Sequence, residues 1–256
     1  MQTDSVPFVL TGDLLFNYSN TDGTYIYRFD AGLNTQLKSR NLKSIYFFVG
    51  NLSLIRSEGQ DFQNSWFLHA RYNKKLKNDR WRLEAFVQDQ DNELLTVNSR
   101  TLVGGGLRLK LFNNATIQGY LGNSYMYEME KSDVAGTKTY NHRNSTYFSM
   151  GVNFAKVNLD LVNTIYFQPL YQDISNYRVL EQFKAEIPII EKLRVSALFN
   201  YYYNSLTPLN KSEYSSVFSL GLTLSLSSGK KTVNKSLKEF LLYPPVSNSI
   251  SMIHGP

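Results

Sequence analysis

The sequence contains no cysteine, so it can form no disulfide bridge, no thiolate nucleophile and no cysteine-based metal site. It also lacks any run of 18 apolar residues, which excludes a protein that spans a membrane with α-helices. A membrane β-barrel is not excluded, because only alternate residues of its strands face lipid. The three histidines, His69, His142 and His254, are too scattered to predict a metal site.

The beginning and the charge of the chain exclude further classes. Met1 is followed by Gln-Thr-Asp-Ser-Val, without the basic start and apolar core of a signal peptide, so we expect a mature N-terminus with an added Met. The formal net charge is +6, of which four lysines and Glu239 place +3 in residues 228–256. The rest of the chain is nearly balanced, and we expect no nucleic-acid partner.

Alternation of apolar and polar residues is the main pattern that is present. In residues 80–112, Trp81, Leu83 and Val87 alternate with charged residues, and the alternation resumes after three glycines. A period of two predicts β-strands with one apolar face. Twelve such segments, each roughly 10 to 15 residues long, suit membrane strands, which need about 9 to 11. They are 7–19, 24–37, 42–56, 64–75, 80–88, 100–112, 115–130, 141–155, 157–168, 177–189, 193–204 and 214–226.

These segments predict an all-β fold, a transmembrane up-and-down antiparallel β-barrel of about twelve strands formed by residues 1–227. The residues predicted to face lipid include Trp81, Leu83, Val87, Phe199, Tyr201, Leu220 and Leu222. Segment 42–56 is apolar on both faces, and its facing is open. Residues 228–256 are expected to form a polar, loosely ordered tail, with a docking helix over 235–243 as the alternative.

The connections predict how the barrel sits in the membrane. Short connections at 38–41, 77–79, 113–114, 155–156 and 190–192 alternate with longer ones, such as 89–98, 131–140 and 205–212. Outer-membrane barrels have short periplasmic turns and long outer loops. We therefore expect the outer membrane of a Gram-negative bacterium, with both termini periplasmic. A soluble all-β fold is the alternative, but it would not carry a wholly apolar outer wall.

Two stretches resemble a known family. Residues 84–111 (EAFVQDQDNELLTVNSRTLVGGGLRLKL) and residues 166–226, within a similar portion from Trp66 to Leu226, resemble a bacterial outer-membrane barrel family catalogued as a domain of unknown function, with a salt-induced outer-membrane protein among its members. Its landmarks here are Arg100, 104–106, Arg108, 176–178, 200–203 and Pro208. The resemblance implies a fold and a location, and it implies no activity.

The polar face of each strand predicts a charged lumen. The inward basic residues are Arg28, Arg71, Arg80, Arg82, Arg100, Arg108, Lys110, Arg178, Lys184 and Arg194, and the inward acidic residues are Asp13, Asp30, Glu84, Glu128, Asp160 and Glu186. If Arg80 lies near Arg108, the inward Gly104 and Gly106 leave room beside Glu84 and Arg82 for long side chains.

Two interpretations of this lumen stay open. Ion pairs can fill a narrow barrel, or the arginines can line a passage that favours anions. Arg71, Arg82, Arg100, Arg108 and Lys110 share the inward face of three successive segments with Glu84 alone as a counterweight, which predicts a positive field.

The functional prediction is therefore a narrow diffusion channel or binder for small anionic solutes, in contact with membrane lipid and without a cofactor. The alternative is a structural or accessory subunit, with a closed lumen, that assembles with other outer-membrane proteins. An enzyme is not expected. His142 sits where a membrane phospholipase of this architecture keeps its histidine, but Asn144 occupies the position of the nucleophilic serine and Ser145 points the other way.

Overall fold

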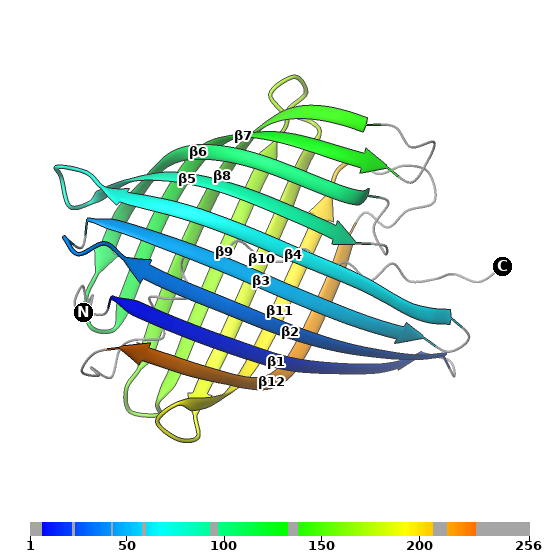
Figure 1. Cartoon of the computed structure of the whole chain (residues 1–256), viewed down its shortest axis with the longest axis horizontal. Coiled ribbons are helices and arrows are strands. Elements are labelled where there is room, and N and C mark those ends of the chain that lie inside the picture. The colour runs from blue at the N-terminus through cyan, green and yellow to red at the C-terminus, as the bar shows by residue number, and fades with distance from the viewer. Residues whose placement is uncertain are drawn as a thin grey trace.

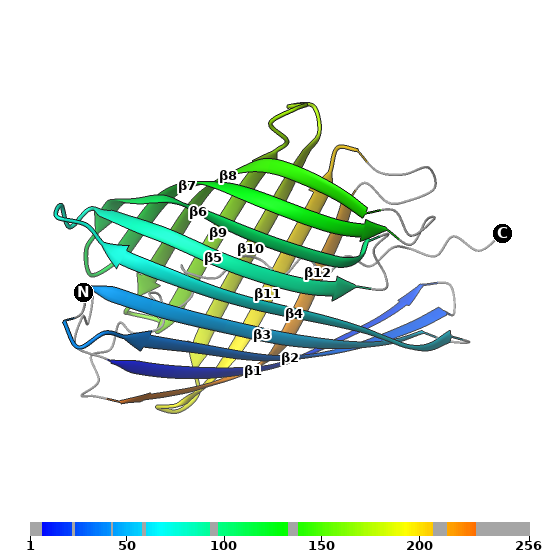
Figure 2. The same cartoon turned by 45° about the horizontal axis from the view of Figure 1, so that its top comes forward.

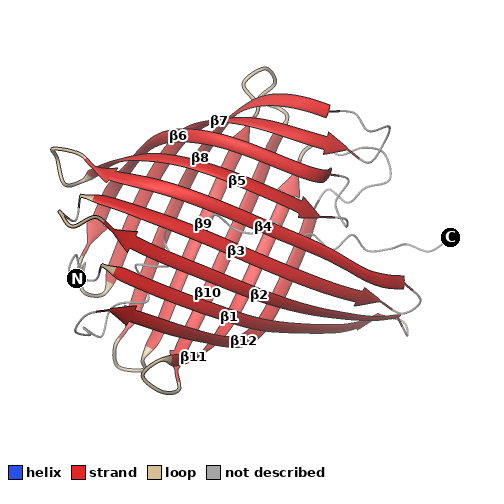
Figure 3. Cartoon of the chain, viewed as in Figure 1, coloured by secondary structure: helices blue, strands red, loops and turns tan. Residues whose placement is uncertain are grey.

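The structure, a computed structural model, describes residues 7–21, 24–41, 43–57, 60–92, 97–132, 138–206 and 214–228. Every regular element within these ranges is a β-strand (Figure 3). No helix in the described part of the chain is long and apolar enough to span a bilayer. The predicted polar tail lies outside the described residues from position 229 onward.

Twelve strands form in the order in which the alternating segments predicted them. They are β1 (Phe8–Thr21), β2 (Thr24–Lys38), β3 (Ser44–Ser57), β4 (Gln60–Lys75), β5 (Trp81–Asn92), β6 (Val97–Asn113), β7 (Ile117–Ser132), β8 (Lys138–Phe154), β9 (Leu159–Pro169), β10 (Tyr177–Pro188), β11 (Leu193–Asn204) and β12 (Tyr214–Ser228). Most are longer than the pattern predicted, because several hairpins extend past the apolar part of the wall.

Each strand pairs antiparallel with its neighbours in sequence, and β1 pairs with β12 to close the barrel (Figures 1 and 2). Phe8 lies opposite Ser228 and Leu14 lies opposite Leu222 at this seam. Closure gives each of the twelve strands a partner on both sides, so the sheet has no free edge strand, which is the condition for a sheet to span a bilayer. The prediction of a twelve-stranded up-and-down barrel is confirmed.

The two ends of the barrel differ in their connections. The turn end carries 39–43, 76–80, 114–116, 155–158 and 189–192, and the loop end carries 22–23, 58–59, 93–96, 133–137, 170–176 and 205–213. β1 begins and β12 ends at the turn end. The connections predicted at 89–98 and 131–140 are shorter in the structure. Only residues 93–96 separate β5 from β6, and only residues 133–137 separate β7 from β8.

The outer face of the barrel is apolar. Leu83, Val87, Leu220 and Leu222 each expose 42–53% of their surface. Trp81 is also exposed, and Phe199 and Tyr201 are half-buried between their neighbours on the same face. A continuous apolar wall of this size is stable only in contact with lipid. The residues predicted to face lipid therefore lie on the outer wall.

The facing of β3, which the sequence left open, is decided in the structure. Ile45, Phe47 and Val49 are buried and pack with Phe67 of β4 inside the barrel. Phe48 and Leu52, on the opposite face of β3, are exposed on the outer wall. One side of the lumen is thus apolar.

Candidate anion site in the barrel lumen

The inward-facing charged residues gather in three groups. The loop-end cluster consists of Arg100, Glu128, Glu130, Arg143 and Arg178, and the central cluster of Arg71, Arg82, Glu84 and Arg108. The seam network consists of Asp13, Asp160, Lys184, Glu186 and Arg194. The first group joins β6, β7, β8 and β10, and the third joins β9, β10, β11 and β1, so each links neighbouring strands along one side of the barrel.

Glu128 is the centre of the loop-end cluster and has no exposed surface. Its carboxylate accepts hydrogen bonds from Arg100 Nε (2.7 Å), Arg143 Nε (3.1 Å) and Arg178 Nη1 (3.0 Å). Glu130 accepts a further bond from Arg178 Nη2 (3.1 Å). Four strands, β6, β7, β8 and β10, are tied together through one carboxylate. Arg100 is therefore compensated, which corrects its assignment to the uncompensated set.

Arg143 and Glu130 were missed in the prediction of the lumen. Arg143 also donates to the main-chain oxygens of Gln168 and Asn176, each at 3.2 Å, and to Asn176 Oδ1 at 3.0 Å. It thereby fastens connection 170–176 to the barrel wall. The alternation of residues could have predicted both. Arg143 lies two positions from the inward Ser145, and Glu130 lies two positions from the inward Glu128, so each pair shares one face of its strand.

The seam network closes the barrel between β1 and β12. Lys184 of β10 donates to Asp13 Oδ1 of β1 (3.0 Å) and to Thr223 Oγ1 of β12 (3.2 Å). Arg194 forms an ion pair with Asp160 (2.7 Å). These contacts run along the inner wall from β9 to β1, and they place three carboxylates against two cations.

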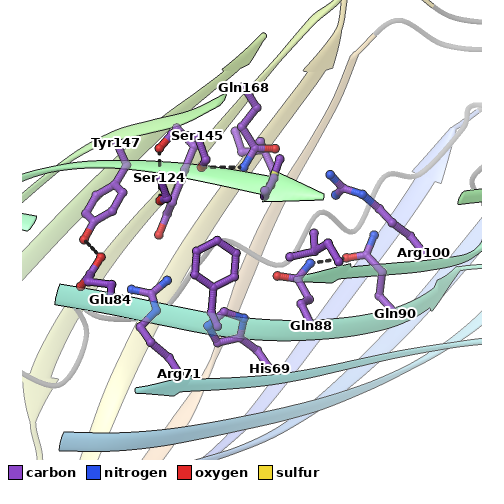
Figure 4. Close-up of a pocket in the computed structure, with 15 residues that line it drawn as sticks. His69, Arg71, Glu84, Gln88, Gln90, Arg100, Ser124, Ser145, Tyr147 and Gln168 are labelled. Carbon is purple, nitrogen blue, oxygen red and sulfur yellow. Dashed lines mark hydrogen bonds between the residues drawn. The ribbon is translucent and has the colours of Figure 1, made fainter. Parts of the chain in front are cut away.

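The central cluster has one carboxylate among three guanidinium groups. Arg108 Nε lies 3.2 Å from Glu84 Oε1. Tyr147 donates its hydroxyl to Glu84 Oε2 at 2.7 Å (Figure 4). Arg71, Arg82 and Arg108 expose 5%, 3% and 2% of their surfaces. With Glu84 ionised, Arg71, Arg108 and Glu84 together carry a net charge of +1. Unmatched buried charge of this size is costly unless another group neutralises it.

Several donors in the central cluster have no acceptor within the described part of the chain. Nε and Nη1 of Arg71 and Nη1 of Arg108 form no hydrogen bond. The planes of the two guanidinium groups lie near aromatic rings instead, with Arg71 Cζ 5.8 Å from the Phe86 centroid and Arg108 Cζ 4.9 Å from that of Tyr120. Buried donors without partners indicate a place for water or an anion.

A small cavity adjoins Arg71. It has a volume of about 30 Å³ and is lined by Arg71, Glu84, Tyr147 and His69, among others (Figure 4). A water molecule needs about 10–15 Å³ by this measure, so the space suits two waters or one small anion. The His69 ring lies between those of Phe67 and Phe86, with centroids 6.1 and 5.9 Å away.

The remaining predicted lumen residues lie outside these groups. Arg28 is 1% exposed and pairs with Asp30 at 2.9 Å, with Ser53 as a second partner. Lys110 is half-buried near the turn end of β6. The placement of Arg80 on the lumen wall was wrong: it lies exposed in connection 76–80, because β5 begins only at Trp81.

The register of β5 and β6 also differs from the expectation. Arg82 lies opposite Arg108, Glu84 opposite Gly106 and Phe86 opposite Gly104. The Phe86 ring packs over Gly104, where an added Cβ would come within 2.5 Å of it. The glycines make room for an aromatic ring and for the backbone of β7, rather than for Arg82.

His142 faces outward at the loop end. Its Nδ1 lies 2.5 Å from the hydroxyl of Tyr125. Asn144 shares this face, while Ser145 is buried inside the barrel, so neither supplies a hydroxyl nucleophile to the histidine. Within the described ranges, no three His, Asp or Glu side chains are grouped to hold a metal ion.

The model of one protein family matches residues 15–226, and that family is described as "Protein of unknown function, DUF481". The chain belongs to the DUF481 family. The resemblance noted in the sequence is thereby confirmed. No curated protein matches this DUF481 chain.

Solved structures share the fold of this DUF481 barrel. The NanC porin is 9% identical with a TM-score of 0.50, covering 86% of this chain and 100% of its own. An outer membrane channel from Pseudomonas putida F1 is also 9% identical with a TM-score of 0.50, covering 86% of this chain and 93% of its own. At this identity the likeness establishes the barrel architecture alone.

Proposed function

We propose that the protein is a barrel of the Gram-negative outer membrane whose lumen binds small anions and lets them cross. The observation that carries this function is the central cluster, in which Arg71 and Arg108 lie beside the single carboxylate Glu84. Low-dielectric walls focus the field of such a group along the lumen. An anion that reaches the cluster gains the free donors of Arg71 and Arg108, whereas a cation is repelled.

Conductance across a planar bilayer tests this proposal. The purified protein should conduct with a preference for chloride over potassium, measured from the reversal potential in a salt gradient. Replacing Arg71 and Arg108 by Ser should reduce that preference roughly severalfold, because the field of the cluster loses two of its three cations. The Lys74→Ser, Lys77→Ser variant removes equal charge from exposed positions at the turn end and should keep the preference.

A closed lumen is the second candidate, and the small volume of the cavity favours it. In that case the barrel serves as a structural or accessory subunit beside other outer-membrane proteins, and the arginines stabilise the wall. The bilayer experiment separates the two candidates. Absence of conductance in both the wild type and the arginine variant, together with a lower melting temperature of the variant, contradicts the channel and supports the closed barrel.

The proposed orientation places the turn end in the periplasm and the loop end outside the cell. It is supported by the two longest connections, 170–176 and 205–213, which lie at the loop end. Trypsin added to intact cells should cut after the exposed Lys131 or Lys138. It should cut after Arg40 and Lys77 only once the outer membrane is permeabilised. Cleavage at the turn-end residues of intact cells reverses the orientation.

A further inference from the structure

The outward face of β7 and β8 changes from charged to polar to apolar over successive cross-strand pairs. From the loop end inward these pairs are Lys131 with Lys138, Met129 with Tyr140, Tyr127 with His142, Tyr125 with Asn144, Asn123 with Thr146, and Leu121 with Phe148. Phosphate, sugar and acyl chain follow in the same order along a phosphorylated glycolipid. The face therefore has the chemical profile of such a lipid.

The two lysines at the top of this face lie directly opposite each other and are exposed. Like charges in such a pair destabilise a hairpin. Within the described part of the chain, neither lysine forms an ion pair, because Glu128 and Glu130 point into the lumen and bind arginines there. An anionic group bound between the lysines removes this repulsion.

Below the lysines lies a hydrogen-bonded layer of aromatic and amide side chains. His142 contacts the hydroxyl of Tyr125 and lies 5.2 Å from the ring of Tyr127, measured between centroids. Asn144 Nδ2 donates to the hydroxyl of Tyr171 at 3.3 Å. Tyr171 comes from connection 170–176, and its main-chain nitrogen donates to His142 O at 2.9 Å. The layer is preorganised and open to the outside, with Tyr125 and Tyr171 about half exposed.

A further polar pair lies deeper still. Asn123 Nδ2 donates to Thr146 Oγ1 at 2.7 Å, and the apolar Leu121 and Phe148 follow. On β2, by comparison, the outward face passes from Tyr27 directly to Phe29. An aromatic girdle explains tyrosines at the membrane interface, but it needs neither paired lysines nor two layers of amides.

We propose that this face of β7 and β8 binds a phosphorylated glycolipid of the leaflet at the loop end. Its phosphates lie on Lys131 and Lys138, its sugar rings stack on the tyrosines and His142 and hydrogen-bond Asn144, and its acyl chains follow Leu121 and Phe148. On the β5 side the site is bounded by Asp89, which accepts a hydrogen bond from Thr101 at 2.6 Å. The inference rests on the proposed outer-membrane location.

Native mass spectrometry of the full chain in detergent, titrated with lipid A, tests the site. Lipid A is a bisphosphorylated, acylated diglucosamine. The Lys131→Gln, Lys138→Gln variant should bind it about 10-fold more weakly or worse, because two cations near the membrane surface are lost. The Lys74→Gln, Lys77→Gln variant makes the same charge change at the turn end and should retain wild-type affinity. Unchanged affinity of the first variant, or equal losses in both, overturns the proposal.

A second variant tests the sugar layer without changing charge. Asn144→Leu should weaken binding of lipid A and leave binding of phosphatidylglycerol, an anionic lipid without sugar, unchanged. Equal effects on both lipids contradict the assignment of Asn144 to a sugar. Heat-dependent mobility on gels checks that each variant is folded. Binding needs no conductance, so a closed barrel that binds lipid A refutes the channel alone, and a conducting barrel that does not bind it refutes this site alone.

Discussion

Replacing Glu128 by alanine is expected to lower the free energy of unfolding by about 3–5 kcal/mol. The substitution leaves Arg100, Arg143 and Arg178 buried around an empty position, with only Glu130 to balance three guanidinium groups. Removing one partner of a buried ion pair is costly because the other charges stay desolvated. Urea titration of the protein in lipid vesicles, followed by tryptophan fluorescence, measures the change.

The control for this measurement is Asp79→Ala in the turn end. Asp79 pairs with Lys75 at 2.8 Å, but its side chain is 75% exposed. Exposed pairs contribute at most about 1 kcal/mol. A second consequence is specific to the loop end: loss of Glu128 removes the carboxylate that orients Arg143, so connection 170–176 should become more sensitive to protease. Equal urea midpoints for the Glu128 and Asp79 variants contradict the structural role of the cluster.

The second large effect is expected from Gly106→Ala in β6. An added Cβ at this position would lie 2.1 Å from the main-chain oxygen of Asn123 and 2.5 Å from Ser124 Cα. Both atoms belong to the backbone of β7, which can yield only if the ladder between β6 and β7 opens. Overpacking of this kind typically costs about 1–3 kcal/mol or more, and here the cost falls on strand pairing. The folded fraction after refolding, measured by heat-dependent gel mobility, should drop strongly.

Gly12→Ala is the matched control in another strand. The nearest atom to its added Cβ is Gly32 O at 4.0 Å, an ordinary contact. Replacing glycine by alanine without strain stabilises a protein by about 0.4–1 kcal/mol through the unfolded chain. Gly12→Ala should therefore refold as well as the wild type. If Gly106→Ala refolds equally well, the close approach of β6 and β7 is wrong.

The two functional candidates depend on different groups of the same lumen. In the loop-end cluster and the seam network every charged side chain has an ion-pair partner, and the two groups sum to +1 and −1, so they stabilise the wall whether or not the barrel conducts. The central cluster differs in having one carboxylate, Glu84, and several buried donors without acceptors in the described part of the chain, on Arg71 and Arg108. Variants at Arg71 and Arg108 therefore inform about function, while variants at Glu128 inform about folding.

The alternation of apolar and polar residues predicted which charged side chains face the lumen, but it did not predict which partners they bind. Arg100 and Arg108 share one face of β6, yet Arg100 binds Glu128 across the β6–β7 pair, whereas Arg108 turns to Glu84 of β5. The sequence contains both carboxylates. It does not reveal the register that decides between them, since a shift of two residues keeps every side chain on its own face.

Strand ends were predicted least well. Arg80 was placed in the lumen because the alternation reaches it, but the turn 76–80 takes it out of the strand. The hairpins of β5 with β6 and of β7 with β8 extend past the apolar wall, and few apolar residues mark these extensions. Hydrophobic alternation marks the part of a strand that contacts lipid, and it does not mark the part that extends into water.

The sequence by itself determined the number of strands, the apolar outer wall and the family, because side chains alternate with period two along any strand and this property is local. It could not decide which face of β3 points into the lumen, because both faces are apolar. Packing against Phe67 places Phe47 inside. The tertiary structure alone decided the charge groups. Asp13 and Lys184 are 171 positions apart, and Arg178 and Glu128 are 50 apart. Barrel closure and strand register bring such pairs together, and neither is encoded in a local pattern.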